Sequence, residues 1–275
     1  MPAFPFRQVD VFGGAALGGN PVAVVLDAAG VDGAAMRAFA RWTNLSETTF
    51  VLPASAEGAD YRLRIFTPAR ELPFAGHPTL GSAHAWAEHT GSTADRLVQE
   101  CAAGLVELRR DGDGWAFAAP PLVRTGPPSH EDLLSAVQAL GVDDEDVLEA
   151  AWVDNGPGWL GLRLASAGTV LGLRPDFQAM AVPIGVIGAH GEGGPADYEV
   201  RAFVPGDRIA EDPVTGSLNA GLAEWFFGTG VEQESYTVRQ GTAVGATGAV
   251  RVSNEAGAFW VAGATRTVIE GRVGL

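Results

Sequence analysis

The stretch ADYRLRIFTP at Ala59–Pro68 returns as ADYEVRAFVP at Ala196–Pro205. Three further matches follow the same order: H-P-x-x-G-S at His77–Ser82 with D-P-x-x-G-S at Asp212–Ser217, Asp32 and Met36 with Asp176 and Met180, and the hairpins that begin at Gly104 and Gly248. Matches that keep their order and lie about half a chain apart indicate an internal repeat. We therefore expect two similar halves related by a pseudo-two-fold axis.

Each half has the same predicted order of strands and helices. Apolar alternation predicts strands, and apolar residues spaced three and four apart predict helices. Strands are expected at 6–12, 21–26, 48–52 and 61–67, helices at 32–43, 78–89, from Asp176 and at 213–227, and a hairpin at 105–119. Strands mixed with helices and hairpins favour an α+β fold.

Four prolines near the middle of the chain mark the predicted boundary between the halves: Pro120, Pro121, Pro127 and Pro128. Clustered prolines are typical of linkers. We expect an N-terminal half at 1–122 and a C-terminal half at 123–275. The repeat also allows the last strand, near 266–275, to join the first half.

The composition excludes several classes of chemistry. The chain has 275 residues and a net charge of −15, and all 18 basic residues are arginine. Without lysine it forms no pyridoxal-phosphate Schiff base and no Walker-A phosphate loop. The acidic balance argues against nucleic acid and against anionic membranes as partners. The single Cys101 and the absence of a charged, apolar leader favour the cytoplasm.

Two predicted helix starts are candidate binding groups. His77 and Asp212 each precede a proline, which suits the first helical turn, and aspartate is a good N-cap. Helix N-termini offer free N–H groups and positive potential that attract a carboxylate. If the halves face each other, two such ends would hold a small carboxylate. Ordinary helix capping is the alternative interpretation.

One carboxyl group has no counterpart in the second half. Glu47 lies in N-L-S-E-T-T-F at Asn44–Phe50, directly before an apolar strand. Partial burial there would raise its pKa toward neutrality, as general acid–base catalysis requires. A solvated turn glutamate is the alternative. No spacing of His or Cys indicates a metal, and the glycines at 13–19 lead into a strand rather than a helix, so no dinucleotide site is expected.

These motifs together resemble the phenazine-biosynthesis PhzF-like family. The resemblance rests on G-N-P at Gly19–Pro21, N-L-S-E at Asn44–Glu47, A-G-H-P-T at Ala75–Thr79 and E-D-P-V-T-G-S at Glu211–Ser217, and it covers nearly the whole chain. It implies the diaminopimelate-epimerase-like fold, in which two pseudo-symmetric halves each wrap a mostly antiparallel sheet around a central helix. It also implies a homodimer and an active site between the halves.

The resemblance implies roles for eight residues. Glu47 matches the family's proton shuttle, and His77 and Asp212 match residues that assist proton transfer or bind the substrate. Asn20, Ser46, Gly76, Gly216 and Ser217 match positions that contact the substrate. No cofactor is implied. One departure is Ala246-Thr247-Gly248, where the family often has arginine and proline after the glycine.

We therefore expect a cofactor-independent isomerase that moves a proton on a small carboxylated metabolite, similar to trans-2,3-dihydro-3-hydroxyanthranilate isomerase. The fold also hosts racemases with two opposed thiols, and a chain with Cys101 alone lacks that pair. Two other classes stay open at this point. One is a non-catalytic small-ligand-binding protein that retains the inter-domain cleft, and the other is a structural or interaction module.

Overall fold

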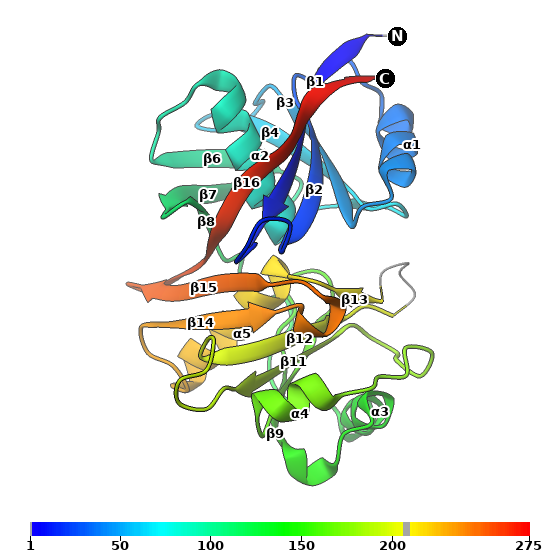
Figure 1. Cartoon of the computed structure of the whole chain (residues 1–275), viewed down its shortest axis with the longest axis vertical. Helices are drawn as coiled ribbons and strands as arrows, with labels where there is room; N and C mark the ends of the chain where they lie inside the picture. Colours follow the sequence, from blue (N-terminus) through cyan, green and yellow to red (C-terminus); the bar gives the residue numbers. More distant parts are fainter. Residues whose placement is uncertain (1, 206–209) are drawn as a thin grey trace. The chain divides into compact units, whose positions relative to one another are not determined.

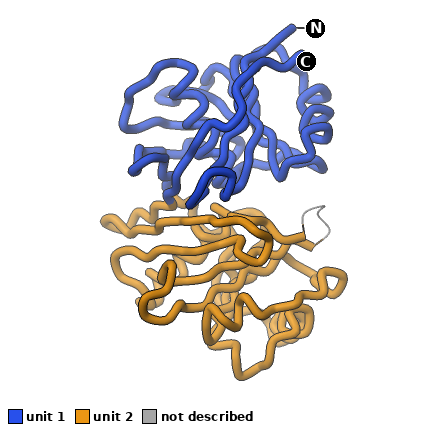
Figure 2. Tube along the Cα trace, in the orientation of Figure 1, with its two compact units in different colours: residues 1–118, 262–275 blue, residues 119–261 orange. Residues whose placement is uncertain are grey.

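The computed structural model describes residues 2–205 and 210–275. The chain forms two compact units, coloured separately in Figure 2. Unit 1 comprises Met1–Ala118 with Ala262–Leu275, and unit 2 comprises Ala119–Val261. The long strand β16 (Ala258–Gly274) runs from unit 2 into unit 1, so the C-terminal residues pack with the N-terminal ones.

Unit 1 is a closed barrel of eight strands in the order β1-β2-β3-β4-β6-β7-β8-β16, with β16 pairing again with β1. Helix α2 (Gly76–Thr90) contacts β1, β2, β3, β4, β6 and β8, and ten of its residues are buried. Small residues allow this close packing: a Cβ on Gly81 would overlap Val22 Cγ1. The strands are β1 (Ala3–Val11), β2 (Asn20–Val25), β3 (Glu47–Leu52), β4 (Tyr61–Phe66), β6 (Arg96–Cys101), β7 (Gly104–Asp111) and β8 (Gly114–Ala118).

The outer face of the barrel carries helix α1 (Gly33–Thr43). Asp32 caps it by accepting hydrogen bonds from the backbone N–H of Ala34 and Ala35, so the helix predicted at 32–43 is confirmed. The apolar face of α1, including Met36 and Phe39, packs against residues of β2, β3 and β4. Asn44 ends the helix with a left-handed backbone (φ 56°), and the chain then enters β3 at Glu47.

Unit 2 is a sheet in the order β15-β14-β12-β11-β10-β9 with helices on both faces (Figure 1). Helix α5 (Gly216–Thr229) lies on one face, where a Cβ on Gly185 would overlap Leu218. Helices α3 (His130–Leu140) and α4 (Ala167–Gly172) share the core of the other face with Leu160 and Leu162. The strands are β9 (Val147–Trp152), β10 (Leu160–Leu164), β11 (Ile184–Ala189), β12 (Tyr198–Phe203), β14 (Ser235–Gln240) and β15 (Gly248–Glu255).

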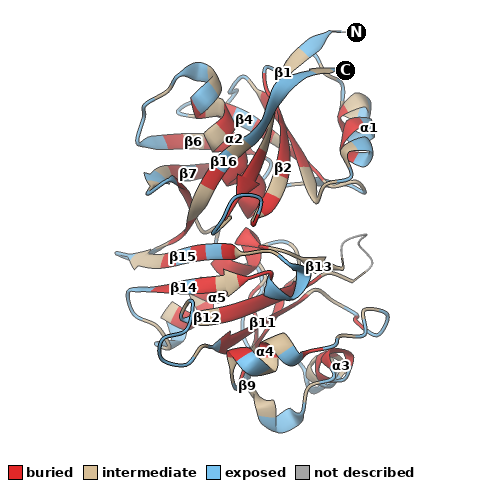
Figure 3. Ribbon diagram, in the orientation of Figure 1, coloured by how far each residue is buried: buried red, intermediate tan, exposed pale blue. Residues whose placement is uncertain are grey.

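The architecture is sheet-rich and carries five α-helices among the described residues, in agreement with an α+β fold. Burial coloured in Figure 3 follows this plan, with β2 almost entirely buried. A sheet wrapped around a central helix describes unit 1. Unit 2 instead has a sheet between helices. The pseudo-two-fold relation between the halves stays a prediction.

Two predicted helix starts are wrong. Residues 177–179 form a turn near which Asp176 Oδ1 accepts from Gln178 N, and no helix begins there. Asp212 is not a helix N-cap, because it lies in the short strand β13 (Glu211–Asp212) and α5 begins at Gly216 after Thr215. The physical reason is that β13 pairs with β12, which holds Asp212 opposite Ala202 in extended backbone.

The structure also corrects the alignment of the repeat. In unit 1, β5 (Glu71–Leu72) pairs with β4, and Glu71 binds Arg64 with both carboxylate oxygens. In unit 2, β13 pairs with β12, and Glu211 binds Arg201 in the same way. The two arginines occupy the same position of the A-D-Y-x-x-R repeat, so the two glutamates correspond.

With that register, each helix begins five residues after its glutamate, at Gly76 and at Gly216. His77 then corresponds to Ser217, and Leu72 corresponds to Asp212. The expected match of H-P-x-x-G-S with D-P-x-x-G-S is therefore wrong by five residues. Short motifs of proline, glycine and serine recur easily, whereas a paired arginine and glutamate fix the register by geometry.

Candidate active site

Glu47 and His77 meet in unit 1. Alternation along β3 places Glu47 on the same face as Thr49, whose hydroxyl lies 2.9 Å from that of Ser82 on α2. Glu47 is therefore directed at α2, and its Oε2 lies 3.2 Å from His77 Nε2. The two side chains are only 15% and 5% exposed. The sequence predicted both residues, and the structure brings them together.

Burial determines the charge of this pair. Desolvation lowers the pKa of His77 to about 3, so the imidazole is neutral at pH 7. The 3.2 Å contact therefore places the Glu47 carboxyl group against a neutral ring.

Three predicted binding residues lie in the same unit. Asn20 is fully buried on β2 and shares its face with Val22, which packs against Gly81 of α2. Ser46 is half-buried in the bend before β3. Gly76 is the buried first residue of α2, and no side chain caps that helix start. Because backbone N–H groups of a first helical turn have no partner within the helix, this helix start is suited to bind a carboxylate.

Asp10 supports this region, and sequence reasoning did not single it out as a site residue. Its side chain is buried, and Oδ1 accepts from Gly19 N at 2.9 Å. Burial raises the pKa of Asp10, while backbone N–H groups of Gly19, Gly18 and Leu17 lower it. The glycines at 13 and 19 are the sequence feature that could have pointed to Asp10. A Cβ on either of them would overlap the Asp10 carboxylate. Asp10 therefore holds the loop that precedes Asn20.

In unit 2, Asp212 belongs to a network of hydrogen bonds at the start of α5. Thr215 Oγ1 donates to Asp212 Oδ2 at 2.6 Å. Gln240 Nε2 donates to Thr215 Oγ1 at 2.9 Å and to the Asp212 carbonyl at 3.3 Å. Sequence reasoning did not single out Thr215 or Gln240, since isolated polar residues carry no pattern.

Gly216 and Ser217 form the buried first turn of α5. Ser217 Oγ accepts from Trp159 Nε1 at 3.1 Å, and its carbonyl accepts from Asn155 Nδ2 at 2.8 Å. The Ser217 hydroxyl thus already has a protein donor, and it retains its own proton for a further acceptor. The predicted site residues therefore form two groups, with Asn20, Ser46, Glu47, Gly76 and His77 in unit 1 and Asp212, Gly216 and Ser217 in unit 2.

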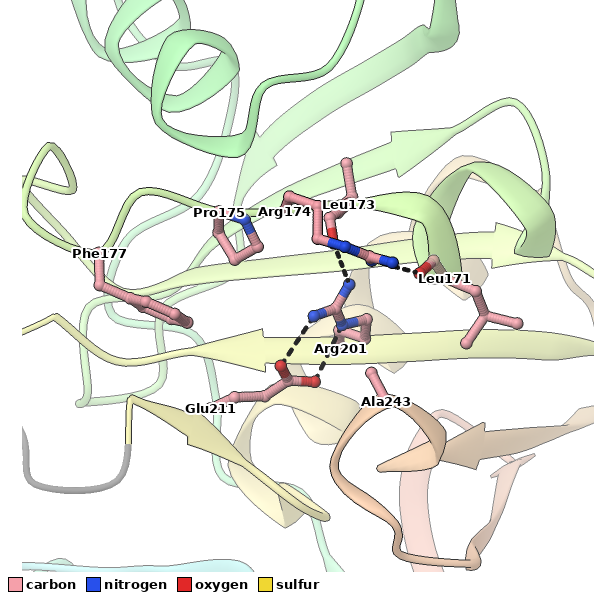
Figure 4. Close-up of a pocket in the computed structure, with 8 residues that line it drawn as sticks. All are labelled: Leu171, Leu173, Arg174, Pro175, Phe177, Arg201, Glu211 and Ala243. Carbon is pink, nitrogen blue, oxygen red and sulfur yellow. Dashed lines mark hydrogen bonds and ion pairs between the residues drawn. The ribbon is translucent and has the colours of Figure 1, made fainter.

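A separate pocket of about 490 Å³ lies in unit 2 and contains none of the predicted site residues (Figure 4). Its buried charges neutralise each other. Arg201 binds Glu211 with two nitrogens and donates through its third to the carbonyls of Val170 and Leu173. Arg174 Nη1 donates to carbonyls at the end of α4. These contacts fix α4 to β12, so we assign the pocket no part in the chemistry.

Residues 2–205 and 210–275 contain no group of three or more His, Cys, Asp or Glu side chains that could hold a metal ion. Within those ranges, no helix has the length and apolar character needed to cross a membrane.

Comparison with known proteins agrees with the motifs and the fold. A family model described as a phenazine biosynthesis-like protein matches residues 9–271. The chain belongs to this PhzC-PhzF family. It is similar to the crystal structure of a PhzF-family phenazine biosynthesis protein from Enterococcus faecalis, with a TM-score of 0.82 and 27% identity over 100% of both chains. The PhzF-family fold is thereby shown.

Two curated relatives are also similar over most of their length. Antisense-enhancing sequence 1 of Schizosaccharomyces pombe is 38% identical over 295 aligned residues, 99% of each chain. Trans-2,3-dihydro-3-hydroxyanthranilate isomerase of Pseudomonas aeruginosa is 36% identical over 221 residues, 78% of this chain and 77% of that protein. Isomerase names among the PhzC-PhzF relatives support a general isomerase role for this chain.

Proposed function

We propose that this PhzC-PhzF protein is a cofactor-independent isomerase that transfers a proton within a small carboxylated metabolite. The 3.2 Å contact between Glu47 and the neutral, buried His77 is the observation that carries the proposal. Proton transfer by a positioned side chain typically accelerates a reaction about a hundred- to ten-thousandfold. The substrate class follows the isomerase relatives, whose named substrate carries a carboxylate.

In the proposed reaction, the Glu47 carboxylate takes a proton from one carbon of the substrate. The electron pair of that C–H bond moves into the adjacent unsaturated system. Glu47, now a carboxylic acid whose proton exchanges with solvent, gives a proton to a second carbon, and the double bond shifts. Atoms and electrons balance without an oxidant, a reductant or a cofactor.

His77 is proposed to keep Glu47 in position without competing for the proton. The imidazole is proposed to carry its single proton on Nε2, 3.2 Å from Glu47 Oε2. Because burial holds the pKa of His77 near 3, the ring does not take a second proton from the substrate at neutral pH. Glu47 is then the group that carries the proton between carbons.

The carboxylate of the substrate is proposed to bind at the uncapped start of α2, at Gly76. Backbone N–H groups and the helix dipole supply positive potential there, without lysine. Asn20, Ser46, Asp212, Gly216 and Ser217 are the further residues proposed to contact the substrate.

The test is solvent-proton exchange in the Glu47→Gln variant. Trans-2,3-dihydro-3-hydroxyanthranilate is incubated in D₂O with the wild type, Glu47→Gln or the control Glu57→Gln, which alters an exposed glutamate. We expect the wild type and the control to isomerise it with deuterium uptake and Glu47→Gln to bind it without uptake. Uptake by Glu47→Gln would refute the role of Glu47, and binding without uptake by the wild type would favour the ligand-binding protein.

A further inference from the structure

The turn that carries Asp212 is held by a buried glutamine from a strand that lies far along the chain. Gln240, the last residue of β14, is completely buried. Its side chain contacts three residues at the start of α5: Asp212, Thr215 and Asn219. Every polar atom of the Gln240 side chain therefore has a partner in this turn or helix.

The contacts fix which way the amide of Gln240 points. Its Oε1 faces two donors, Thr215 N at 3.1 Å and Asn219 Nδ2 at 2.9 Å. Its Nε2 faces two oxygens, the Asp212 carbonyl and Thr215 Oγ1. A flipped amide would set its NH₂ against donors and its oxygen against acceptors, so the hydrogen-bond network assigns one orientation.

This orientation also fixes the proton of Thr215. Because Gln240 Nε2 donates to Thr215 Oγ1, the hydroxyl uses a lone pair for that bond and directs its own proton elsewhere. The acceptor is Asp212 Oδ2, 2.6 Å away. The chain of donors thus runs from Gln240 to Thr215 to the Asp212 carboxylate, and a hydroxyl donor favours the ionised form of that carboxylate.

Close backbone packing holds the same turn against the segment that follows Gln240. Gly241 has φ +91°, and a Cβ there would overlap the carbonyl of Pro213. A Cβ on Gly248 would overlap Val214 Cγ2. The turn at 212–215 therefore has little freedom to move away from Gln240.

Unit 1 shows that the backbone plan does not require this network. By the strand register, Cys101 of β6 occupies the position of Gln240, because Arg62 pairs with Glu100 as Glu199 pairs with Arg239. Leu72 and Ala75 stand where unit 2 has Asp212 and Thr215, and a backbone bond from Ala103 N to the Pro73 carbonyl is found there. The same turn and helix start form there without an amide at the position of Gln240, while the nearby Gln99 of β6 is buried and donates to Thr79 Oγ1 of α2 at 3.0 Å.

We propose that Gln240 is a positioning residue that orients the Thr215 hydroxyl toward Asp212 and so fixes that carboxylate for its contact with substrate. The inference rests on the proposed function in the role it gives to Asp212. The arrangement of Gln240, Thr215 and Asp212 can nevertheless be tested without turnover.

The experiment follows the Asp212 carboxyl carbon by NMR through a pH titration of the full chain labelled with ¹³C-aspartate, assigned with Asp212→Asn. Gln240→Met removes the amide, and Thr215→Val removes the hydroxyl. We expect both variants to raise the titration midpoint of Asp212. Thr215→Ser, which keeps the hydroxyl, should retain the wild-type midpoint. So should the control Tyr236→Phe, a buried residue of the same strand.

Kinetics supply a second measurement with trans-2,3-dihydro-3-hydroxyanthranilate. We expect kcat of Gln240→Met and of Thr215→Val to fall about tenfold, with KM changed less. This is the effect expected from losing one hydrogen bond to a charged group. An unchanged Asp212 midpoint in Thr215→Val would overturn the proposal even if Gln240→Met does not fold. So would an equal shift in Tyr236→Phe. If Glu47→Gln keeps proton exchange while the midpoints move as expected, the proposed function fails and the positioning role stands.

Discussion

The starts of α2 and α5 are built on one backbone plan and carry different chemistry. Each follows a two-residue strand whose glutamate binds an arginine of the preceding long strand, and each begins at a glycine five residues later. At the next position, unit 1 has His77 against Glu47, and unit 2 has Ser217 against Trp159. Gln240 contacts the turn before α5 in unit 2, whereas in unit 1 Cys101 takes the position of Gln240 and the nearby Gln99 contacts Thr79 of α2.

In the proposed reaction, the two helix starts have different tasks. Glu47, beside the neutral His77, moves the proton. Asp212, which accepts from the Thr215 hydroxyl, is a fixed acceptor. The two starts share a backbone arrangement and differ in their side chains. Chemistry should therefore be sensitive to Glu47 far more than to Asp212.

The largest expected effect is on proton exchange. We expect Glu47→Gln to reduce deuterium uptake about a hundred- to ten-thousandfold, because the group that carries the proton is lost. Asp212→Asn keeps the shape of the side chain and should lower the rate of deuterium uptake about tenfold, the effect of losing one hydrogen bond to a charged group. Uptake rates measured by ¹H NMR compare the two. Equal losses would contradict the division of tasks.

The two arginine–glutamate pairs should differ strongly in their contribution to stability. Arg201 is 5% exposed and also donates to the Val170 and Leu173 carbonyls. Arg201→Met leaves Glu211 buried without its cation, so it should lower the free energy of unfolding by about 3–5 kcal/mol. Arg64 and Glu71 are 25% and 36% exposed, and Arg64→Met should cost about 1 kcal/mol or less. Urea unfolding of both variants decides the matter, and equal costs would show that burial does not distinguish the pairs.

The corrected register makes Gly81 and Gly221 equivalent, and this can be tested by adding a methyl group. A Cβ on Gly81 would overlap Val22, and one on Gly221 would overlap the Val153 carbonyl. In both alanine variants the free energy of unfolding should fall by about 1–3 kcal/mol. Gly228, later in α5, has open space around it, and Gly228→Ala should gain about 0.5–1 kcal/mol from helix propensity. Thermal unfolding of the three variants gives the ranking, and a stabilised Gly221→Ala would break the proposed equivalence.

The smallest effect is a pH dependence specific to unit 1. The pKa of His77 is about 3 in the folded chain against 6.5 unfolded, so between these values the unfolded chain binds a proton that the folded chain does not. The contribution of His77 to the free energy of unfolding is therefore complete above pH 6.5. Below that pH it falls by at most about 1.4 kcal/mol for each pH unit. The slope in urea unfolding at pH 4 to 6 should be smaller in His77→Gln by that amount. Identical pH slopes in the wild type and in His77→Gln would show that His77 takes up its proton at the same pH in the folded and the unfolded chain.

Local patterns predicted most of unit 1 correctly. Alternation predicted β1 to β4 and the β7–β8 hairpin, although not β6. The helix expected at 32–43 forms between Asp32 and Asn44, and Glu47 begins an apolar strand. The alternation of side chains along β3 also places Glu47 and Thr49 on the same face of the strand. Only packing of α2 inside the barrel brings His77 against that face, since residues 47 and 77 have no relation in sequence spacing.

Local patterns failed where a strand pairing or a side-chain network overrides them. Asp212 followed by proline is a good helix start in isolation, yet pairing of β13 with β12 keeps it extended. Asp10 and Gln240 lie within strands, where a single polar residue carries no periodic signal. Their importance comes from partners at Gly19 and at Thr215, which only the folded chain supplies.

The sequence by itself determined the family, the α+β composition and the candidate residues Glu47, His77 and Asp212, because motifs and short-range periodicity are written in consecutive residues. Tertiary structure decided which of these residues meet, that His77 is neutral, and that Ser217 is its counterpart in the other unit. The physical reason is that burial, strand register and hydrogen-bond direction depend on residues far apart in the chain. These are the quantities that set the charge and orientation of a catalytic group.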